Sequence, residues 1–249
     1  SPTTATRGFL LFPLLLALSA FRRCDSDSSR ATYYGSPDTL GTETGSCGYG
    51  EYGRTVLGGY VAGVSGRLYG SGSGCGACYH LTCRRPYQCS KDGATVVVTD
   101  SGGSDYADFV LSGRAFAKLA GPGRARGLFG LGAVQVEYRR IPCSYPGNNI
   151  HVQVHENSRM DEYLAVIIQY QGGAYQLSAV EILQEGLEST PMRNAFGCVW
   201  DSANPPEGAL SLRLELLAED GGHRSLELTE VIPEAWEAGQ AYDANIQLS

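Results

Sequence analysis

Six cysteines constrain this chain more than any other feature, because they lie together in a stretch rich in glycine and tyrosine. They are Cys47, Cys75, Cys78, Cys83, Cys89 and Cys143. In a reducing compartment, the Cys75-x-x-Cys78 spacing with two further cysteines nearby would indicate a zinc site. In an oxidising compartment, the same residues form a disulfide framework, although the sequence alone does not choose among the possible pairings. The interpretation therefore depends on whether the chain is exported.

The N-terminal segment has the composition of an export signal. Arg7 supplies a positive charge, residues 9–18 are almost entirely apolar, and Leu18-Ser19-Ala20 offers a small-residue cleavage site. An apolar run of about 10 residues is too short to span a bilayer, which requires roughly 20. We therefore expect a signal peptide at residues 1–20, an N-terminal arm at 21–30, and a secreted, extracellular protein whose thiols are oxidised.

The charge balance narrows the class of partner. The chain has 19 basic and 26 acidic residues, and without residues 1–30, which contain four Arg and two Asp, the net charge is −9. Proteins that bind nucleic acid or anionic membranes usually present a basic field, and an acidic protein also repels polyanionic glycans such as pectin. We therefore expect no nucleic acid and no membrane as partners, and we expect a neutral ligand.

The pattern of the chain changes at Cys143 and predicts two mainly β domains. Before Cys143, residues 94–99 form a continuous apolar run typical of a strand buried on both faces, and residues 133–138 alternate. Ser112 is the expected N-cap of a single helix over 112–120. After a turn-rich linker at 144–149, alternating stretches at 151–155, 163–170, 176–183 and 210–216 indicate a β-sandwich.

Seven segments stand out along the chain: TYYG (32–35), GSCGYG (45–50), CGACY (75–79), VVVTD (96–100), LSGRAF (111–116), VIPEAW (231–236) and AYDANIQL (241–248). Together, and in this order, they resemble the plant expansin superfamily. SRATYYGSPD and VHENSR are similar to the expansin-like B branch in particular. The resemblance implies a six-stranded double-psi β-barrel at 31–143 and an immunoglobulin-like, cellulose-binding-type β-sandwich at 150–249, related to β-expansins and grass-pollen allergens.

The family pattern also implies how the cysteines pair: Cys47–Cys75, Cys78–Cys143 and Cys83–Cys89. Cys24 and Cys198 are then left over, and they would meet only if the N-terminal arm crossed to the second domain. We therefore expect Cys198 to be a buried free thiol that behaves as a small hydrophobic residue. The four histidines are scattered without metal-ligand spacing, so we expect no metal and no other cofactor, and the protein is expected to be a monomer.

The ligand implied by the resemblance is a cell-wall polysaccharide, namely cellulose, xyloglucan or xylan. In the barrel, Thr32, Tyr33 and Tyr34 match a groove-lining motif, and Asp100 matches a groove carboxylate that can bind sugar hydroxyls. For one of the two tyrosines, packing of the first strand is the alternative. For Asp100, the alternative is a turn-forming role before Ser101.

In the sandwich, the resemblance implies an aromatic platform that lies on the glucan. Tyr163 and Trp200 match its positions, with Tyr170 as a third member. A flat aromatic row binds sugar rings because it buries their apolar faces with little loss of conformational freedom. Packing in the sandwich core is the alternative for Trp200.

The chain departs from the family at the position of its essential aspartate. The expansin motif His-Phe-Asp aligns with Asp108, Phe109 and Val110, and valine cannot transfer a proton. An inverting glycosidase needs an acid and a base about 6.5–9.5 Å apart. We therefore expect no catalytic residue and no hydrolysis. The leading hypothesis is a protein that binds wall polysaccharide and loosens its contacts without an enzymatic step. The alternatives are a binding protein without loosening activity and a weak hydrolase that uses Asp100 with Asp105 or Asp108.

Overall fold

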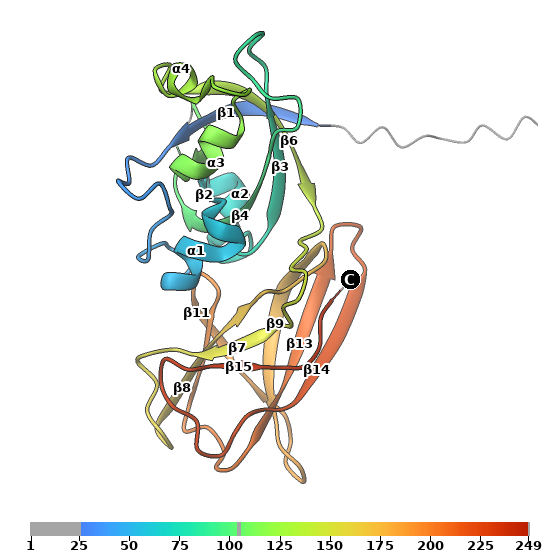
Figure 1. The fold of residues 1–249 in the computed structure, drawn as a ribbon. Helices are drawn as coiled ribbons and strands as arrows, with labels where there is room; N and C mark the ends of the chain where they lie inside the picture. Colours follow the sequence, from blue (N-terminus) through green and yellow to red (C-terminus); the bar gives the residue numbers. More distant parts are fainter. Residues whose placement is uncertain (1–25, 104–105, 249) are drawn as a thin grey trace, which may run out of the picture.

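The structure is a computed structural model that describes residues 26–103 and 106–248. A closed β-barrel and a β-sandwich are stacked end to end (Figure 1). The expected signal peptide at 1–20, Cys24 and Asp105 lie outside the described residues. Within the described part of the chain, no helix is long and apolar enough to cross a membrane.

Six strands close the barrel in the order β1-β5-β2-β4-β3-β6. β1 with β5 and β2 with β4 are parallel pairs, whereas the other neighbours are antiparallel. The six-stranded barrel implied by the resemblance is therefore confirmed. The strands are β1 Asp27–Tyr33, β2 Val61–Val64, β3 Cys78–Cys83, β4 Ala94–Ser101, β5 Phe109–Leu111 and β6 Val134–Ile141.

Two of these strands show how the sequence encodes the barrel. β1 begins at Asp27, inside the segment expected to be an arm, because residues 27–31 pair with residues 134–138 of β6. The apolar run in β4 is buried on both faces. Val96 and Val98 belong to the barrel core, and Val97 belongs to a second cluster that includes Cys78 and Cys143.

Short helices cover the barrel (Figure 1). Only one of them is predicted from the sequence, and there the Ser112 hydroxyl accepts a hydrogen bond from the Ala115 N–H at 3.1 Å, which confirms the N-cap. The first of the others contains non-helical backbone from Val56 to Gly58, which obscures its periodicity. The helices are α1 Glu51–Gly59, α2 Gly66–Tyr69, η1 Gly70–Gly72, α3 Gly113–Lys118 and α4 Ala125–Phe129.

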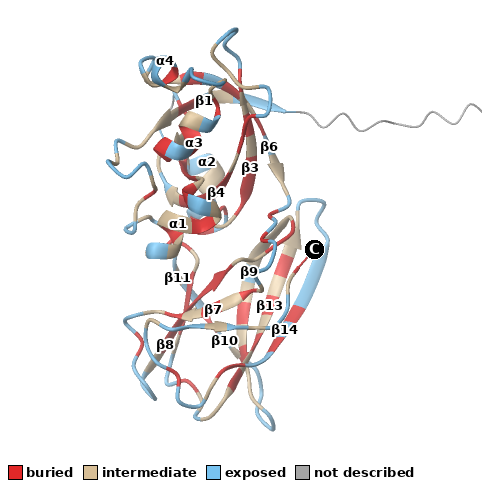
Figure 2. Cartoon of the chain, viewed as in Figure 1, coloured by how far each residue is buried: buried red, intermediate tan, exposed pale blue. Residues whose placement is uncertain are grey.

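The sandwich has two antiparallel sheets, of order β10-β9-β13-β14 and β11-β12-β8-β7-β15. Along β13, the buried Leu210, Leu212, Leu214 and Leu216 alternate with partly exposed residues, as the sequence predicts. Buried residues follow the strands of both domains (Figure 2). The sandwich strands are β7 His151–Val154, β8 Tyr163–Gln169, β9 Tyr175–Leu183, β10 Thr190–Pro191, β11 Arg193–Phe196, β12 Val199–Ala203, β13 Leu210–Ala218, β14 His223–Ile232 and β15 Ala241–Asp243.

Three disulfides join the pairs implied by the resemblance, Cys47–Cys75, Cys78–Cys143 and Cys83–Cys89. Among the described residues, Cys198 is the cysteine without a disulfide. Burial raises the pKa of its thiol to about 12, so the thiol stays protonated at neutral pH. The Cys198 thiol donates a hydrogen bond to the Cys47 carbonyl at 2.9 Å, at the junction of the two domains.

Candidate functional site

The strand register places four positions in one row across the barrel: Thr32 of β1, Val110 of β5, Gly63 of β2 and Asp100 of β4. The glycine in this row leaves room for Tyr34, because a Cβ on Gly63 would lie 2.3 Å from the Tyr34 hydroxyl oxygen. Tyr34 can therefore pass over Gly63 and reach the carboxylate at the end of β4. The row contains one hydroxyl, one carboxylate and a valine.

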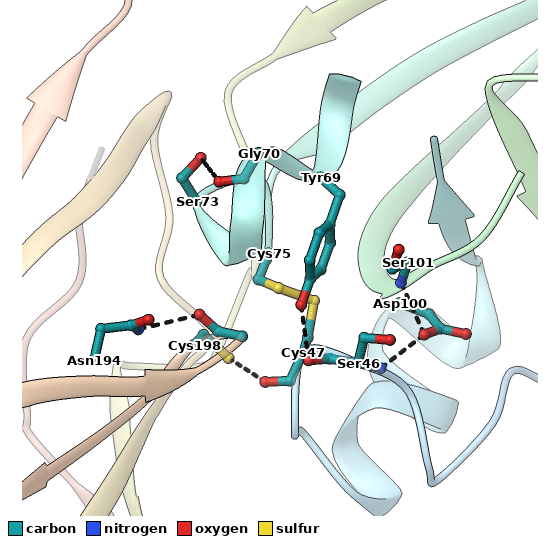
Figure 3. Close-up of a disulfide and its surroundings, with 11 residues drawn as sticks. Ser46, Cys47, Tyr69, Gly70, Ser73, Cys75, Asp100, Ser101, Asn194 and Cys198 are labelled. Atoms are coloured by element: carbon teal, nitrogen blue, oxygen red, sulfur yellow. Dashed lines mark hydrogen bonds between the residues drawn. A yellow bond between two sulfur atoms is a disulfide. The ribbon is translucent and has the colours of Figure 1, made fainter. Parts of the chain in front are cut away.

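Asp100 is the best-organised polar group of this row. Its Oδ1 accepts hydrogen bonds from the Ser46 N–H at 2.7 Å and from the Ser101 N–H at 2.8 Å (Figure 3). Its Oδ2 accepts one from the Tyr34 hydroxyl at 2.9 Å. Because each carboxylate oxygen can accept two hydrogen bonds, Oδ2 retains capacity for a ligand hydroxyl.

The Tyr34 hydroxyl is a permanent donor to this carboxylate. Burial, and then the negative charge and hydrogen bond of Asp100, raise the pKa of Tyr34 well above its usual range. The hydroxyl therefore stays protonated at neutral pH and well above it. The pair of Tyr34 and Asp100 is thus held in one geometry.

Tyr33 and Thr32 point elsewhere. The Tyr33 ring packs against Phe116 and Phe129, with ring centroids 4.8 and 4.7 Å apart. The Thr32 hydroxyl donates to the Gly132 carbonyl at 2.9 Å. Of the two tyrosines, Tyr33 therefore has the packing role given as the alternative, and Tyr34 is the one that reaches Asp100.

The other carboxylate of the aligned motif, Asp108, is already engaged. Arg67 lies 2.9 Å from its Oδ2, and the Ser65 hydroxyl donates to its Oδ1. Burial opposes ionisation, but hydrogen bonds from Ser65, Ser29 and Arg67 together hold the pKa of Asp108 below its usual range. Asp108 is therefore ionised at neutral pH and cannot donate a proton as a general acid.

In the sandwich, Tyr163 and Trp200 lie on opposite faces of one sheet. Trp200 belongs to the sandwich core and is 8% exposed. Its neighbour Asp201 faces the other way, where it accepts a hydrogen bond from the Tyr163 hydroxyl at 2.9 Å. Because side chains alternate along a strand, no shared platform of these two residues can form. The prediction of an exposed platform is therefore wrong for Trp200.

Tyr170 is also placed differently from the expectation. Its ring contacts those of Tyr52, Tyr145 and His151, with centroids 4.8, 5.5 and 5.2 Å apart. Its N–H donates to the Tyr52 hydroxyl oxygen at 2.9 Å. This aromatic cluster packs the barrel against the sandwich, so Tyr170 has a structural role at the junction.

Phe196, at the end of β11, is an exposed aromatic residue of the sandwich that sequence reasoning missed. It is 51% exposed, and its ring lies 6.4 Å from that of His155. Both residues border a cleft of about 310 Å³ between the barrel loop 43–50 and the sandwich. The only sequence signal for it is an aromatic residue beside a turn glycine, Gly197.

The loop 43–50 connects the two parts of the site. A Cβ on Gly45 would lie 3.3 Å from the Asp100 Cβ, and one on Gly48 would lie 2.9 Å from the Phe196 ring. The surface formed by Tyr34, Asp100, this loop and Phe196, which we call the junction surface, therefore runs over both domains. Within the described ranges, no group of three His, Cys, Asp or Glu side chains is arranged to hold a metal ion.

Comparison with known families and proteins gives a consistent picture. The family model of the expansin C-terminal domain matches residues 150–233, and a model described as lytic transglycolase matches residues 61–138. Expansin-like B1 of Arabidopsis thaliana is 46% identical, with 96% of this chain and 94% of that protein covered. Expansin-like B1 of Oryza sativa subsp. japonica is 40% identical, with 95% of each chain covered.

Two solved structures of Clavibacter michiganensis expansin share the fold. The apo crystal structure has a TM-score of 0.66 at 20% identity and covers 90% of this chain and 98% of its own. The structure of a variant in complex with cellohexaose has a TM-score of 0.67 at 19% identity, with the same coverage. At this identity, the likeness establishes the architecture of the barrel followed by the sandwich.

Proposed function

This chain belongs to the expansin-like B family, and we propose that it binds cell-wall polysaccharide, cellulose or a neutral hemicellulose such as xyloglucan or xylan, without hydrolysing it. One observation carries the proposal. The Asp100 carboxylate is held by Ser46, Ser101 and Tyr34, while its row holds Val110 where a second carboxylate would be needed. Such an arrangement accepts sugar hydroxyls but lacks the acid and base pair of a glycosidase.

The junction surface gives the ligand two kinds of contact. At the barrel end, Asp100 accepts hydrogen bonds from sugar hydroxyls, and at the sandwich end the exposed Phe196 stacks on a sugar face. Tyr163 lies on the same outward face of the sandwich sheet and adds a hydroxyl. The net negative charge of the chain favours a neutral polysaccharide over an anionic one.

Loosening, in this proposal, is a consequence of binding. A surface that holds a separated polysaccharide chain more tightly than a chain packed on its neighbours shifts the equilibrium away from adhesion. No covalent step is needed. Three disulfides suit an oxidising location, and we propose that the protein is secreted to the cell wall.

Binding to purified cellulose and xylan tests the ligand surface. We expect Phe196→Ala and Asp100→Asn each to weaken binding by roughly tenfold, because they remove a stacking face and a charged acceptor. Tyr87→Ala, which removes a 93%-exposed aromatic residue from the Cys83–Cys89 loop, is the matched control and should bind like the native protein. Equal binding by all four proteins would contradict the proposed surface.

A weak hydrolase is the second candidate, because Glu43 borders the same cleft as Tyr34 and could partner Asp100. Glu43 is exposed and lies 3.8 Å from Arg54. Release of reducing ends from the same substrates separates the two functions. We expect none above the background of Asp100→Asn, and release that this substitution abolishes would establish hydrolysis.

Wall extension under constant load tests whether binding of the polysaccharide loosens the wall. The native protein is compared with Val110→Asp. Creep with the native protein would show that loosening needs no carboxylate at position 110. Creep with Val110→Asp alone would identify the native chain as a binder that lacks the loosening step. If neither protein causes creep, the function reduces to carbohydrate binding, and the barrel serves as its scaffold.

A further inference from the structure

A second cleft lies at the domain junction, on the other side of the Cys47–Cys75 disulfide from Asp100. Figure 3 shows Ser73 and Asn194 on one side of this disulfide and Asp100 on the other. The cleft has a volume of about 260 Å³ and lies between the barrel segment 71–75 and the sandwich strands β9, β11 and β12. Its polar lining comes from Ser71, Ser73, Gln176, Ser178, Asn194 and Trp200.

Trp200 provides the most informative group of this cleft. The residue is 92% buried, yet in the described part of the chain its indole N–H has no hydrogen-bond partner. Among the described residues, every fully enclosed side-chain nitrogen or oxygen has a hydrogen-bond partner, so the unpartnered Trp200 N–H must be accessible. Trp200 is one of the residues that line the cleft. A buried tryptophan N–H normally has an acceptor. Trp200 therefore brings an accessible donor to the border of this cleft.

Three other side chains of the lining keep a free acceptor although each already donates a hydrogen bond. The Ser73 hydroxyl donates to the Gly70 carbonyl at 2.9 Å, and the Ser178 hydroxyl donates to the Glu215 carbonyl at 2.9 Å, which leaves both oxygens able to accept. The Asn194 amide nitrogen donates to the Gly197 carbonyl at 3.2 Å, which leaves its amide oxygen free. Among the described residues that line the cleft, none has a charged side chain. A ligand that matches it is neutral and both donates and accepts hydrogen bonds.

We propose that this cleft binds one neutral pyranose ring, such as a terminal or branch sugar of a polysaccharide, independently of the junction surface. Hydroxyl groups on a sugar ring satisfy the Trp200 donor and the Ser73, Ser178 and Asn194 acceptors together. The volume lies just below the range of about 300–1,000 Å³ typical of small-molecule pockets, so the cleft fits a single ring better than a chain. This site goes beyond the polysaccharide surface proposed above, because it is built from different residues on another side of the junction.

Nuclear magnetic resonance of the indole groups tests the site directly, because the chain contains two tryptophans. Trp236 lies in the sandwich core and does not line the cleft. Glucose, xylose and galactose are titrated separately into the full chain, and Trp200→Phe identifies the Trp200 signal. We expect a saturable shift of the Trp200 indole signal with at least one of these sugars, and no shift of the Trp236 signal.

Two variants make the result specific. Ser178→Ala removes one acceptor at an exposed strand position, and we expect the dissociation constant to rise about three- to tenfold. Phe196→Ala disrupts the junction surface, and we expect it to leave the titration unchanged, even if cellulose binding fails. No shift with any of the three sugars, or a shift that disappears in Phe196→Ala, would overturn the proposal.

Discussion

At the scale of single residues, hydrogen-bond partners decide which charged groups can take part in chemistry. Asp201 illustrates this, because it is 4% exposed and still ionised. Arg193 donates to both of its oxygens at 3.0 and 2.7 Å, and the Tyr163 hydroxyl donates at 2.9 Å. A buried carboxylate is tolerated only with such complete pairing. The same principle makes Asp108 a structural ion-pair partner and leaves Asp100 able to bind a ligand.

Asp201 leads to a pH-dependent prediction. Hydrogen bonds from Arg193, and then from Tyr163, hold its folded-state pKa below the value of about 3.9 in the unfolded chain, despite the opposing effect of burial. Its contribution to stability is therefore complete above about pH 4 and is lost as the pH falls through the folded-state pKa. We expect Asp201→Asn to lower the free energy of unfolding at neutral pH and to flatten its decrease on acidification, as measured by urea unfolding between neutral and acidic pH.

Arg193→Gln provides the companion experiment, because it removes the main cause of the lowered pKa of Asp201 and leaves the carboxylate in place. Arg193→Gln should also flatten the decrease in the free energy of unfolding on acidification. If both variants kept the native slope, the Arg193–Asp201 pair would make no contribution to acid sensitivity.

At the scale of elements, the turn between β11 and β12 docks into the barrel. Gly197 has a φ of +50°, and a Cβ there would lie 2.4 Å from the Ser46 carbonyl oxygen and 2.7 Å from that of Cys47. The Cys198 N–H also donates to the Cys47 carbonyl at 3.1 Å. Only glycine fits such a close approach of two backbones. This turn therefore fixes the sandwich against the loop that holds Asp100.

We expect Gly197→Ala to lower the free energy of unfolding by about 3 kcal/mol or more, because it adds a backbone clash to an unfavourable φ. Gly186→Ala is the matched control. Its φ of +77° is also positive, but nothing lies within 4 Å of the added Cβ. It should therefore cost only about 1 kcal/mol. Urea unfolding measures both, and equal losses would show that the docked turn adjusts freely.

The disulfides should differ in their contribution to stability. Cys78–Cys143 closes a sequence separation of 65 residues and Cys83–Cys89 one of 6. In the loop-entropy description, the longer loop contributes about 2 kcal/mol more. We expect the double substitution of Cys78 and Cys143 by Ala to destabilise the protein correspondingly more than that of Cys83 and Cys89, in thermal or urea unfolding. A larger loss from the short loop would contradict this order.

At the scale of the whole molecule, the two domains share one packed junction. One buried cluster contains Cys47 and Tyr49 from the barrel with Ala165, Ile167 and Val199 from the sandwich. The isolated bridge between Cys143 and Gly173 adds two backbone hydrogen bonds of 2.9 Å. Contacts of this kind couple the domains, so we expect barrel and sandwich to unfold in a single calorimetric transition.

Tyr52→Phe tests this coupling. The substitution keeps the ring contacts but leaves the partly buried Tyr170 N–H without its acceptor, at a cost of about 1–3 kcal/mol. We expect a lower unfolding temperature and a broader or divided transition in calorimetry. Tyr60→Phe, which alters a tyrosine that packs against the barrel core, serves as the control. A native-like transition in Tyr52→Phe would mean that the domains are coupled elsewhere.

Much of the fold follows from local patterns. The apolar run of β4, the alternating leucines of β13 and the Ser112 cap of α3 each reflect a rule that acts over a few residues, and the structure agrees with all three. The glycine-rich α1 escaped prediction because a kink interrupts its periodicity. Local patterns thus identified β4, β6, β7, β8, β9 and β13, but not strands such as β2, β5 and β14 or the irregular helices that cover the barrel.

The residues of the candidate site were likewise only partly predictable from local patterns. By itself, the sequence determined the two β domains, the Asp100 carboxylate at the end of a buried strand and the absence of a carboxylate at Val110. Only the tertiary structure decided that Trp200 faces the core, that Phe196 is exposed beside the barrel loop, and that Tyr34 reaches Asp100 over Gly63. Alternation along a strand separates its two faces, but which face is covered depends on segments far away in the sequence that dock against it.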